Sequence, residues 1–366
     1  MFLVRTYAPM STGVHPAEVS AEGSTKPLQP NHEGRLKVLD GWRAVSILMV
    51  MAGHLLPLGP QNFNFNEPVA AGGMAIFFTL SGFLITRFLL DRPEVFPFLV
   101  RRLLRILPLA WLVMIILFFA DGATNSTAPL LANLAFYANL PPAKLLYGGG
   151  HLWSLCVEMH FYLGVALLVA IAGRRGLLLL PVIAVLVTGA RVAAGETISI
   201  VTWHRVDEIL AGAIVALMYP NSFGKFPARI LSQCNFYVAV VLAAVCTYYI
   251  GGPLGYARPY AVAFMVGITL WHAPSWARSL LESRPALYIA KISYALYVFH
   301  GVFTHTWLST GDTVIKYAKR PLLFAVTWAA AHSSTFYYEQ RFIDLAKRLT
   351  TRRLPVGPHF EAGRAR

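Results

Sequence analysis

A few charged and imidazole side chains interrupt the apolar stretches of this 366-residue sequence, and they are the first candidates for chemistry. Ionisable groups in an apolar membrane are costly, so each one is a functional candidate. Arg43 and His54 are 11 positions apart. On a helix this spacing is three full turns plus a rotation of about 20° around the axis, with about 16 Å of rise along it. The two side chains would therefore share one helix face. A snorkelling arginine and a hydrogen-bonded histidine between helices are the structural alternatives.

Three arginines, Arg101, Arg102 and Arg105, open another apolar stretch. Arg102 and Arg105 are three residues apart and would be neighbours on one helix face. Guanidinium groups suit phosphate recognition because they can donate two parallel hydrogen bonds to one group. The excess of basic residues that is typical of cytoplasmic loops would explain the same cluster.

Trp153, Ser154 and Glu158 begin a further stretch, in which Ser154 and Glu158 are four residues apart and face the same way. If this helix begins at Leu152, Glu158 lies about 9 Å below the membrane edge. A carboxylate at that depth needs a partner or a proton. Trp153 alone is most simply a residue of the interfacial aromatic belt.

The remaining polar candidates are more ambiguous. Arg205 and Asp207 begin one stretch, where a local ion pair is the alternative to a functional role. Ser81 and His300 lie in the middle of two others, and a histidine there could simply pack between helices. No pair of histidines has the spacing and acidic neighbours of a metal site, so the sequence predicts no metal.

The composition determines which elements must position these residues. Hydrophobic residues make up 56% of the chain and charged residues 13%, against roughly 25% charged in ordinary globular proteins. The mean hydropathy is +0.55. A soluble protein of this size could not cover its surface with so few charges, and disorder needs the opposite composition. We therefore expect an all-α polytopic integral membrane protein.

Ten apolar segments are candidate transmembrane helices, although several have fewer than the roughly 20 residues of a perpendicular span. They are 42–58, 72–90, 103–120, 152–172, 176–194, 206–220, 236–251, 257–273, 287–308 and 321–340. We expect an N-terminal tail over 1–35, one transmembrane domain over 36–345 and a basic C-terminal tail over 346–366.

The distribution of basic residues predicts the orientation. Of the 31 Lys and Arg residues, 24 fall in tails and loops that lie on one side if the N-terminus is cytoplasmic, and 7 fall on the other side. This excess favours an even number of spans with both termini in the cytoplasm. Topology accounts for the net charge of +14, so we expect contacts with membrane lipids and no nucleic-acid partner.

In this orientation the candidate residues are ordered by depth. The arginine cluster lies at the cytoplasmic face, His54 and Ser81 near mid-depth, and Glu158 and Asp207 in the outer part. Such an arrangement suits a site that an anionic molecule reaches from inside and a second partner reaches from outside. An enzyme and a transporter of a small organic anion fit this pattern equally well.

Six sequence motifs, which occur in the expected order along the chain, resemble those of the membrane acyltransferase type 3 family. They are LDGWRAV (39–45) with His54 behind it, FFTLSGFLIT (77–86), RRLLRILPLAW (101–111), HLWSLCVEMHFYL (151–163), RVDEILAGA (205–213) and ISYALYVFH (292–300). They include that family's Arg, ten residues and His, as well as its Arg-x-x-Arg pair. Met159 stands where family members often have Glu.

The resemblance implies O-acylation of a carbohydrate or glycolipid acceptor by cytoplasmic acyl-CoA, with no permanently bound cofactor. His54 would be the general base on the acceptor hydroxyl, or would relay the acyl group, since a neutral imidazole suits either role. Glu158 would orient an imidazole or stabilise its charged form. The phosphates of CoA would be bound at the cytoplasmic face by Arg101, Arg102 and Arg105. Arg43 would lie beside them as a catalytic residue.

Six residues would shape the acceptor side or support it: Ser81, Trp153, Ser154, Arg205, Asp207 and His300. The leading hypothesis is an acetyltransferase of the bacterial inner membrane that modifies a surface polysaccharide or lipopolysaccharide. An acyltransferase for a small secondary metabolite, an anion transporter and a non-catalytic membrane partner remain as alternatives.

Overall fold

The computed structural model describes residues 36–120, 126–219, 231, 233–249 and 251–351. Within these ranges every regular element is a helix, which confirms the all-α prediction, and no strand occurs in them. Each of the ten segments predicted to cross the membrane contains a helix. The tail 1–35 lies outside the described residues, as does the tail 346–366 beyond residue 351.

Among the described residues, five helical segments are long and apolar enough to cross a membrane. They are α1 (Lys37–Leu55), α2 (Asn66–Asp91), α3 (Val95–Ala120), the segment Gly150–Ala194 and α12 (Arg284–Phe303). The segment Gly150–Ala194 holds two helices, α5 (Trp153–Ala172) and α6 (Leu180–Ala194). The count of ten spans and the side on which the termini lie therefore stay predictions.

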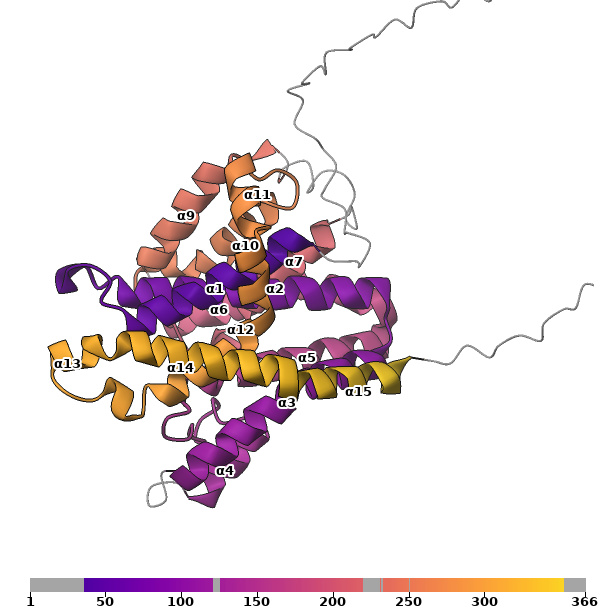
Figure 1. Ribbon diagram of the computed structural model, residues 1–366. Coiled ribbons are helices and arrows are strands. Elements are labelled where there is room, and N and C mark those ends of the chain that lie inside the picture. Colours follow the sequence, from indigo (N-terminus) through magenta and orange to yellow (C-terminus); the bar gives the residue numbers. More distant parts are fainter. Residues whose placement is uncertain (1–35, 121–125, 220–230, 232, 250, 352–366) are drawn as a thin grey trace, which may run out of the picture.

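The other α-helices are shorter. They are α4 (Thr127–Leu134), α7 (Asp207–Met218), α9 (Phe236–Tyr248), α10 (Arg258–Ile268), α11 (Ser275–Leu281), α13 (Thr313–Ala318), α14 (Arg320–Ser333) and α15 (Gln340–Thr350). In Figure 1 the axes of α1, α2, α14 and α15 lie nearly parallel, with α1 running opposite to α2, while α9, α10 and α11 gather on one flank. A π-helical turn, Ser334–Glu339, connects α14 to α15.

Small residues bring the central helices into close contact. Helix α2 packs against α1 and also crosses α7. A Cβ added at Gly82 would collide with the backbone of Ile209, and one added at Gly212 would collide with the backbone of Thr79. In a bilayer, where apolar burial does not drive helix association, such close backbone packing holds helices together.

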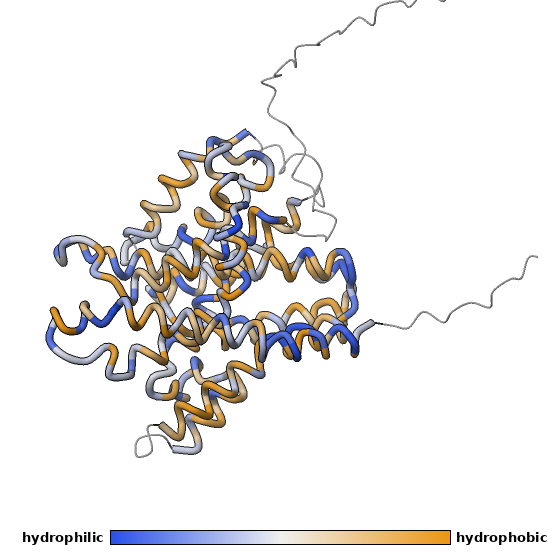
Figure 2. Tube along the Cα trace, in the orientation of Figure 1, coloured by the Kyte–Doolittle hydropathy of each residue, from blue (hydrophilic) through white to orange (hydrophobic). Residues whose placement is uncertain are grey.

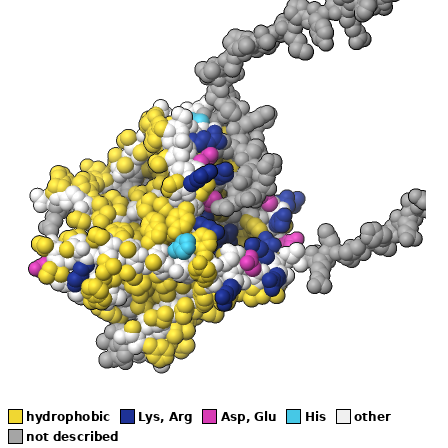
Figure 3. Space-filling view, viewed as in Figure 1, with side chains coloured by type: hydrophobic (Ala, Val, Ile, Leu, Met, Phe, Trp, Pro, Cys, Tyr) yellow, Lys and Arg dark blue, Asp and Glu magenta, His cyan; other side chains and the backbone are white. Residues whose placement is uncertain are grey.

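The outer surface is apolar. Large side chains on three helices are more than half exposed, including Phe119 on α3, Leu167 and Ile171 on α5, and Val185 on α6. Figure 2 shows hydrophobic residues along most of the helices, and Figure 3 shows them over most of the visible face. Most Lys and Arg side chains on that face gather towards the end at which α15 lies (Figure 3). A helical protein with this surface suits a bilayer.

Candidate active site

Two cavities lie at different ends of α1. The first, the basic cavity, has a volume of about 590 Å³ and is lined by five cations: Arg43, Arg87, Arg102, Arg105 and Lys291. The second, the histidine cavity, has a volume of about 380 Å³, and its polar lining includes His54, His151, Trp153, Arg205 and Tyr297. Arg43 and His54, which were predicted to share a helix face, thus line two different cavities.

The basic cavity is suited to an anion. Its five basic side chains outnumber the three acidic ones on its wall, Asp40, Asp91 and Glu339. Two of the acids are held by neighbours on their own helices, since Arg43 Nη1 lies 3.3 Å from Asp40 Oδ1 and Arg87 Nε lies 3.3 Å from Asp91 Oδ2. Positive charge therefore dominates the cavity.

Helix α15 packs along α3 and completes the arginine cluster. Arg101 Nε donates a hydrogen bond to Thr350 Oγ1 at 2.8 Å. Arg101 also lines a smaller adjoining cavity of about 240 Å³, together with Arg102 and Arg105. The three arginines predicted to form one cluster do lie together at one end of α3.

Three histidines from separate helical segments meet beside the histidine cavity. His54 Nδ1 lies 3.2 Å from His300 Nε2, and the ring centroids of His151 and His300 are 5.1 Å apart. His300 is fully buried, whereas His54 is exposed. The close approach needs a glycine beside His300, because a Cβ at Gly301 would collide with the His151 ring.

The hydrogen bonds of His300 determine which nitrogen of His54 carries a proton. His300 Nδ1 lies 2.6 Å from the carbonyl oxygen of Tyr297, which can only accept, so a neutral His300 is protonated on Nδ1. Its Nε2 is then an acceptor, and His54 Nδ1 must donate to it. The free lone pair of His54 is therefore on Nε2. An imidazole in this tautomer can accept a proton at Nε2.

Along the chain, the linings of the two cavities come nearest to each other on α12. Tyr294 lines the basic cavity and Tyr297 lines the histidine cavity, which corresponds to about 4.5 Å of helical rise. Ser81 lies on α2 between residues that line the two cavities, and its hydroxyl donates a hydrogen bond to the Glu158 carboxylate. On the other side, Ser154 Oγ lies 2.6 Å from the Tyr297 hydroxyl.

The structure gives Glu158 a different partner from the imidazole expected of it. Its carboxylate, only 3% exposed, binds Ser81 and interacts electrostatically with Arg102 and Arg105. The ring that contacts His54 is that of His300. Glu158 therefore connects the arginine end of the site to its middle, and His300 orients His54.

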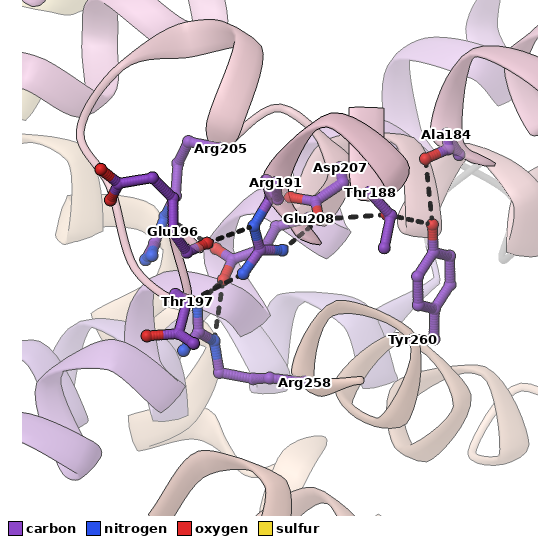
Figure 4. A network of polar contacts seen from close by, with 10 residues as sticks. All are labelled: Ala184, Thr188, Arg191, Glu196, Thr197, Arg205, Asp207, Glu208, Arg258 and Tyr260. Atoms are coloured by element: carbon purple, nitrogen blue, oxygen red, sulfur yellow. Dashed lines mark hydrogen bonds and ion pairs between the residues drawn. The ribbon is translucent and has the colours of Figure 1, made fainter. Parts of the chain in front are cut away.

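Asp207 also lies apart from the cavities. Its buried carboxylate pairs with Arg191 and accepts a hydrogen bond from Thr188 Oγ1 at 3.3 Å (Figure 4). Its neighbour Arg205 does line the histidine cavity, with its guanidinium carbon 5.2 Å from the centroid of the Trp153 ring. Of the predicted acceptor-side residues, Trp153 and Arg205 thus share one cavity with His54, while Asp207 lies in the buried network behind them.

Sequence reasoning did not single out His151. It lies in the motif 151–163 and directly precedes the apolar stretch. No helical spacing, however, predicts that it lies near His54 or His300. The three rings meet only because different helices bring them together. A histidine at the start of an apolar stretch is the one signal that could have identified it.

Comparisons with known proteins extend over most of the chain. A family model described as an acyltransferase domain matches residues 36–332. Nodulation protein 10 of Rhizobium leguminosarum bv. viciae is 26% identical over an aligned length of 381 positions, which covers 89% of this chain and 97% of that protein. Peptidoglycan O-acetyltransferase OatA of Listeria monocytogenes is 26% identical over an aligned length of 317 positions, which covers 72% of this chain and about half (48%) of that enzyme. No solved structure matches the chain.

Proposed function

The chain belongs to this acyltransferase family and is embedded in a membrane, and we propose that it moves an acyl group, most simply acetyl, from cytoplasmic acyl-CoA to a carbohydrate hydroxyl. The acceptor would be a surface or exported glycan, and the membrane would be the inner membrane of a bacterium. The observation that carries this proposal is the 3.2 Å contact between His54 and His300, which leaves His54 Nε2 free at a cavity.

The basic cavity would bind the donor. Phosphate groups of CoA match the excess of guanidinium groups, above all Arg102 and Arg105, which can form charge-assisted hydrogen bonds with them. From there the thioester would have to pass the Ser81–Glu158 pair to reach the histidine cavity. Glu158 would hold the nearby arginines in place while Ser81 satisfies its carboxylate.

The chemistry would take place at His54. Its Nε2 takes the proton of the acceptor hydroxyl as the oxygen attacks the thioester carbonyl carbon. The new oxygen–carbon bond forms, the carbon–sulfur bond breaks, and His54 returns the proton to the leaving thiolate. CoA departs as a free thiol, and the imidazole is neutral again for the next cycle.

The test is mass spectrometry of surface glycans from a strain that lacks this protein. The strain would be complemented with the wild-type protein or with His54→Ala, at matched levels in the membrane. An acyl increment that returns only with the wild type would support the proposal and would identify the acyl group. Identical glycans in both strains, together with no acyl-CoA consumption by the purified protein, would contradict it and would favour a transporter.

A further inference from the structure

A buried cluster of five charged residues lies behind the histidine cavity, and its charges do not balance. Figure 4 shows three arginines around two carboxylates. The side chains of Arg191, Arg205, Asp207, Glu208 and Arg258 are at most 2% exposed. Three positive and two negative charges leave a surplus of one positive charge, in a setting where an unpaired ion is strongly disfavoured.

Two arginines of this cluster have buried nitrogens without a hydrogen bond, Arg205 (Nε and Nη1) and Arg258 (Nη1 and Nη2), and of these two Arg205 is the one that lines the histidine cavity. Asp207 pairs closely with Arg191, and Glu208 Oε1 lies 2.9 Å from Arg258 Nη2 and 3.0 Å from Arg258 Nε. Arg205 Nε approaches Glu208 Oε2 only to 3.4 Å, without a hydrogen bond. Its Nη1 atom is likewise buried and has no hydrogen-bond partner. A guanidinium group that forms so few hydrogen bonds when buried needs another acceptor.

That acceptor would be found in the histidine cavity. Arg205 lines this cavity together with His54, and the flat face of Trp153 lies against the guanidinium group. Glu67, an acid on the same wall, is exposed, and its Oε2 accepts a hydrogen bond from Asn64 Nδ2 at 3.3 Å. Glu196, on a nearby loop, meets the network through its backbone carbonyl oxygen. Neither carboxylate forms an ion pair with Arg205 in the part of the chain that the structure describes.

We propose that Arg205 binds an oxyanion, a carboxylate or a phosphate group, on the molecule that occupies the histidine cavity. This inference rests on the proposed function in one respect, since it makes that molecule the acceptor and hence an acidic glycan. A volume of about 380 Å³ lies within the range of small-molecule sites, roughly 300–1,000 Å³. The acid would anchor the sugar on Arg205 and Trp153 while a hydroxyl of the sugar faces His54.

The first experiment does not depend on acyl transfer. Diethyl pyrocarbonate modifies neutral imidazoles, and peptide mass spectrometry of the purified full-length protein would follow the reaction at His54. Three probes would compete with it: methyl β-glucoside, methyl β-glucuronide and glucose 1-phosphate. The first two differ by one carboxylate, and the third supplies a phosphate. Any molecule bound through Arg205 should shield His54, since both residues line one cavity.

We expect at least one of the two anionic probes to protect His54 at a concentration about tenfold lower than the glucoside does. The preferred probe identifies the anion as carboxylate or phosphate. Arg205→Gln should abolish the preference, Arg205→Lys should keep part of it, and the surface control Arg278→Gln should leave it unchanged. Equal protection by all three probes, protection by none, or an intact preference in Arg205→Gln would overturn the inference. Thermal unfolding of each variant would verify that it is folded.

A second experiment separates this inference from the proposed function. Fragmentation of the acylated glycan should place the acyl group on an acidic sugar or on a residue bonded to one. An acyl group within a neutral stretch of glycan would refute the acidic acceptor and leave the acyltransferase intact. Anion-dependent protection of His54 without any acyl increment would refute the acyltransferase and leave the anion site intact.

Discussion

Replacing His300 with phenylalanine should slow acyl transfer, because it removes the acceptor that keeps the proton on Nδ1 of His54. Phenylalanine retains a flat ring at a position that is 0% exposed, so the change does not leave a large cavity. Glutamine at the same position retains an acceptor oxygen at a similar reach. His300→Gln should therefore recover part of the rate that His300→Phe loses.

The size of the effect follows from this single hydrogen bond. A hydrogen bond between neutral groups contributes about 0.5–1.5 kcal/mol net, and about 1.4 kcal/mol corresponds to a tenfold change in rate. His300→Phe should thus lower the rate of transfer by about two- to thirteenfold. Removing the base itself with His54→Ala should cost about a hundredfold to ten-thousandfold.

The assay is the rate at which an acyl mass increment accumulates on surface glycans after each variant is induced in a strain that lacks the protein. Membrane levels would be matched, and thermal unfolding of the purified variants in detergent would verify folding. The expected order of rates is wild type, His300→Gln, His300→Phe and His54→Ala. If His300→Phe matches the wild type, or if His300→Gln is no faster than His300→Phe, His300 does not orient His54.

Three further predictions concern other parts of the structure. Arg102→Gln should raise the KM for acyl-CoA by about 10- to 150-fold with a smaller change in kcat, because a charge-assisted hydrogen bond to phosphate is lost. Titration of acyl-CoA consumption would measure this KM, and an unchanged KM would exclude the donor role. Glu158→Gln keeps the shape of the side chain but removes the charge beside Arg102. Acyl transfer in the same glycan assay should therefore fall at least about tenfold. Full activity would eliminate a role for the charge. Gly82→Ala should destabilise the protein by about 1–3 kcal/mol, because its methyl group meets the backbone of α7. The matched control is Gly164→Ala, where a Cβ would meet nothing within 4 Å, and equal thermal midpoints for the two variants would refute the close packing.

The sequence predicts the helices well because their apolar runs are long and separated by polar residues. Each of the ten predicted segments contains a helix, although only five helical segments in the described part of the chain meet the length and hydropathy of a span. Short helices such as α7 and α10 pack against other helices, so their burial depends on neighbours that no local pattern reveals. Helix periodicity places Arg102 beside Arg105 in the same way, because the two residues belong to one turn of α3.

Contacts between distant helices could not be predicted. The pairing of His54 with His300 joins residues 246 positions apart, and that of Ser81 with Glu158 joins residues 77 positions apart. Periodicity within one helix determines which residues share a face, but it does not determine which neighbour that face meets. The family resemblance suggests an imidazole as the partner of Glu158, whereas its Ser81 partner follows only from the packing of α2 against the other helices.

The placement of the basic cavity and the histidine cavity has an electrical consequence. Two cavities at different ends of the helices shorten the low-dielectric path, so the membrane potential falls mainly across the region of Tyr294, Tyr297 and the Ser81–Glu158 pair. A potential of 100 mV is worth about 2.3 kcal/mol for each elementary charge that crosses it. In the proposed mechanism no net charge crosses that field, because the thioester enters the histidine cavity uncharged and leaves it as an uncharged thiol once His54 has returned the proton. The reaction would then be electroneutral, and energised and depolarised membranes would support equal rates.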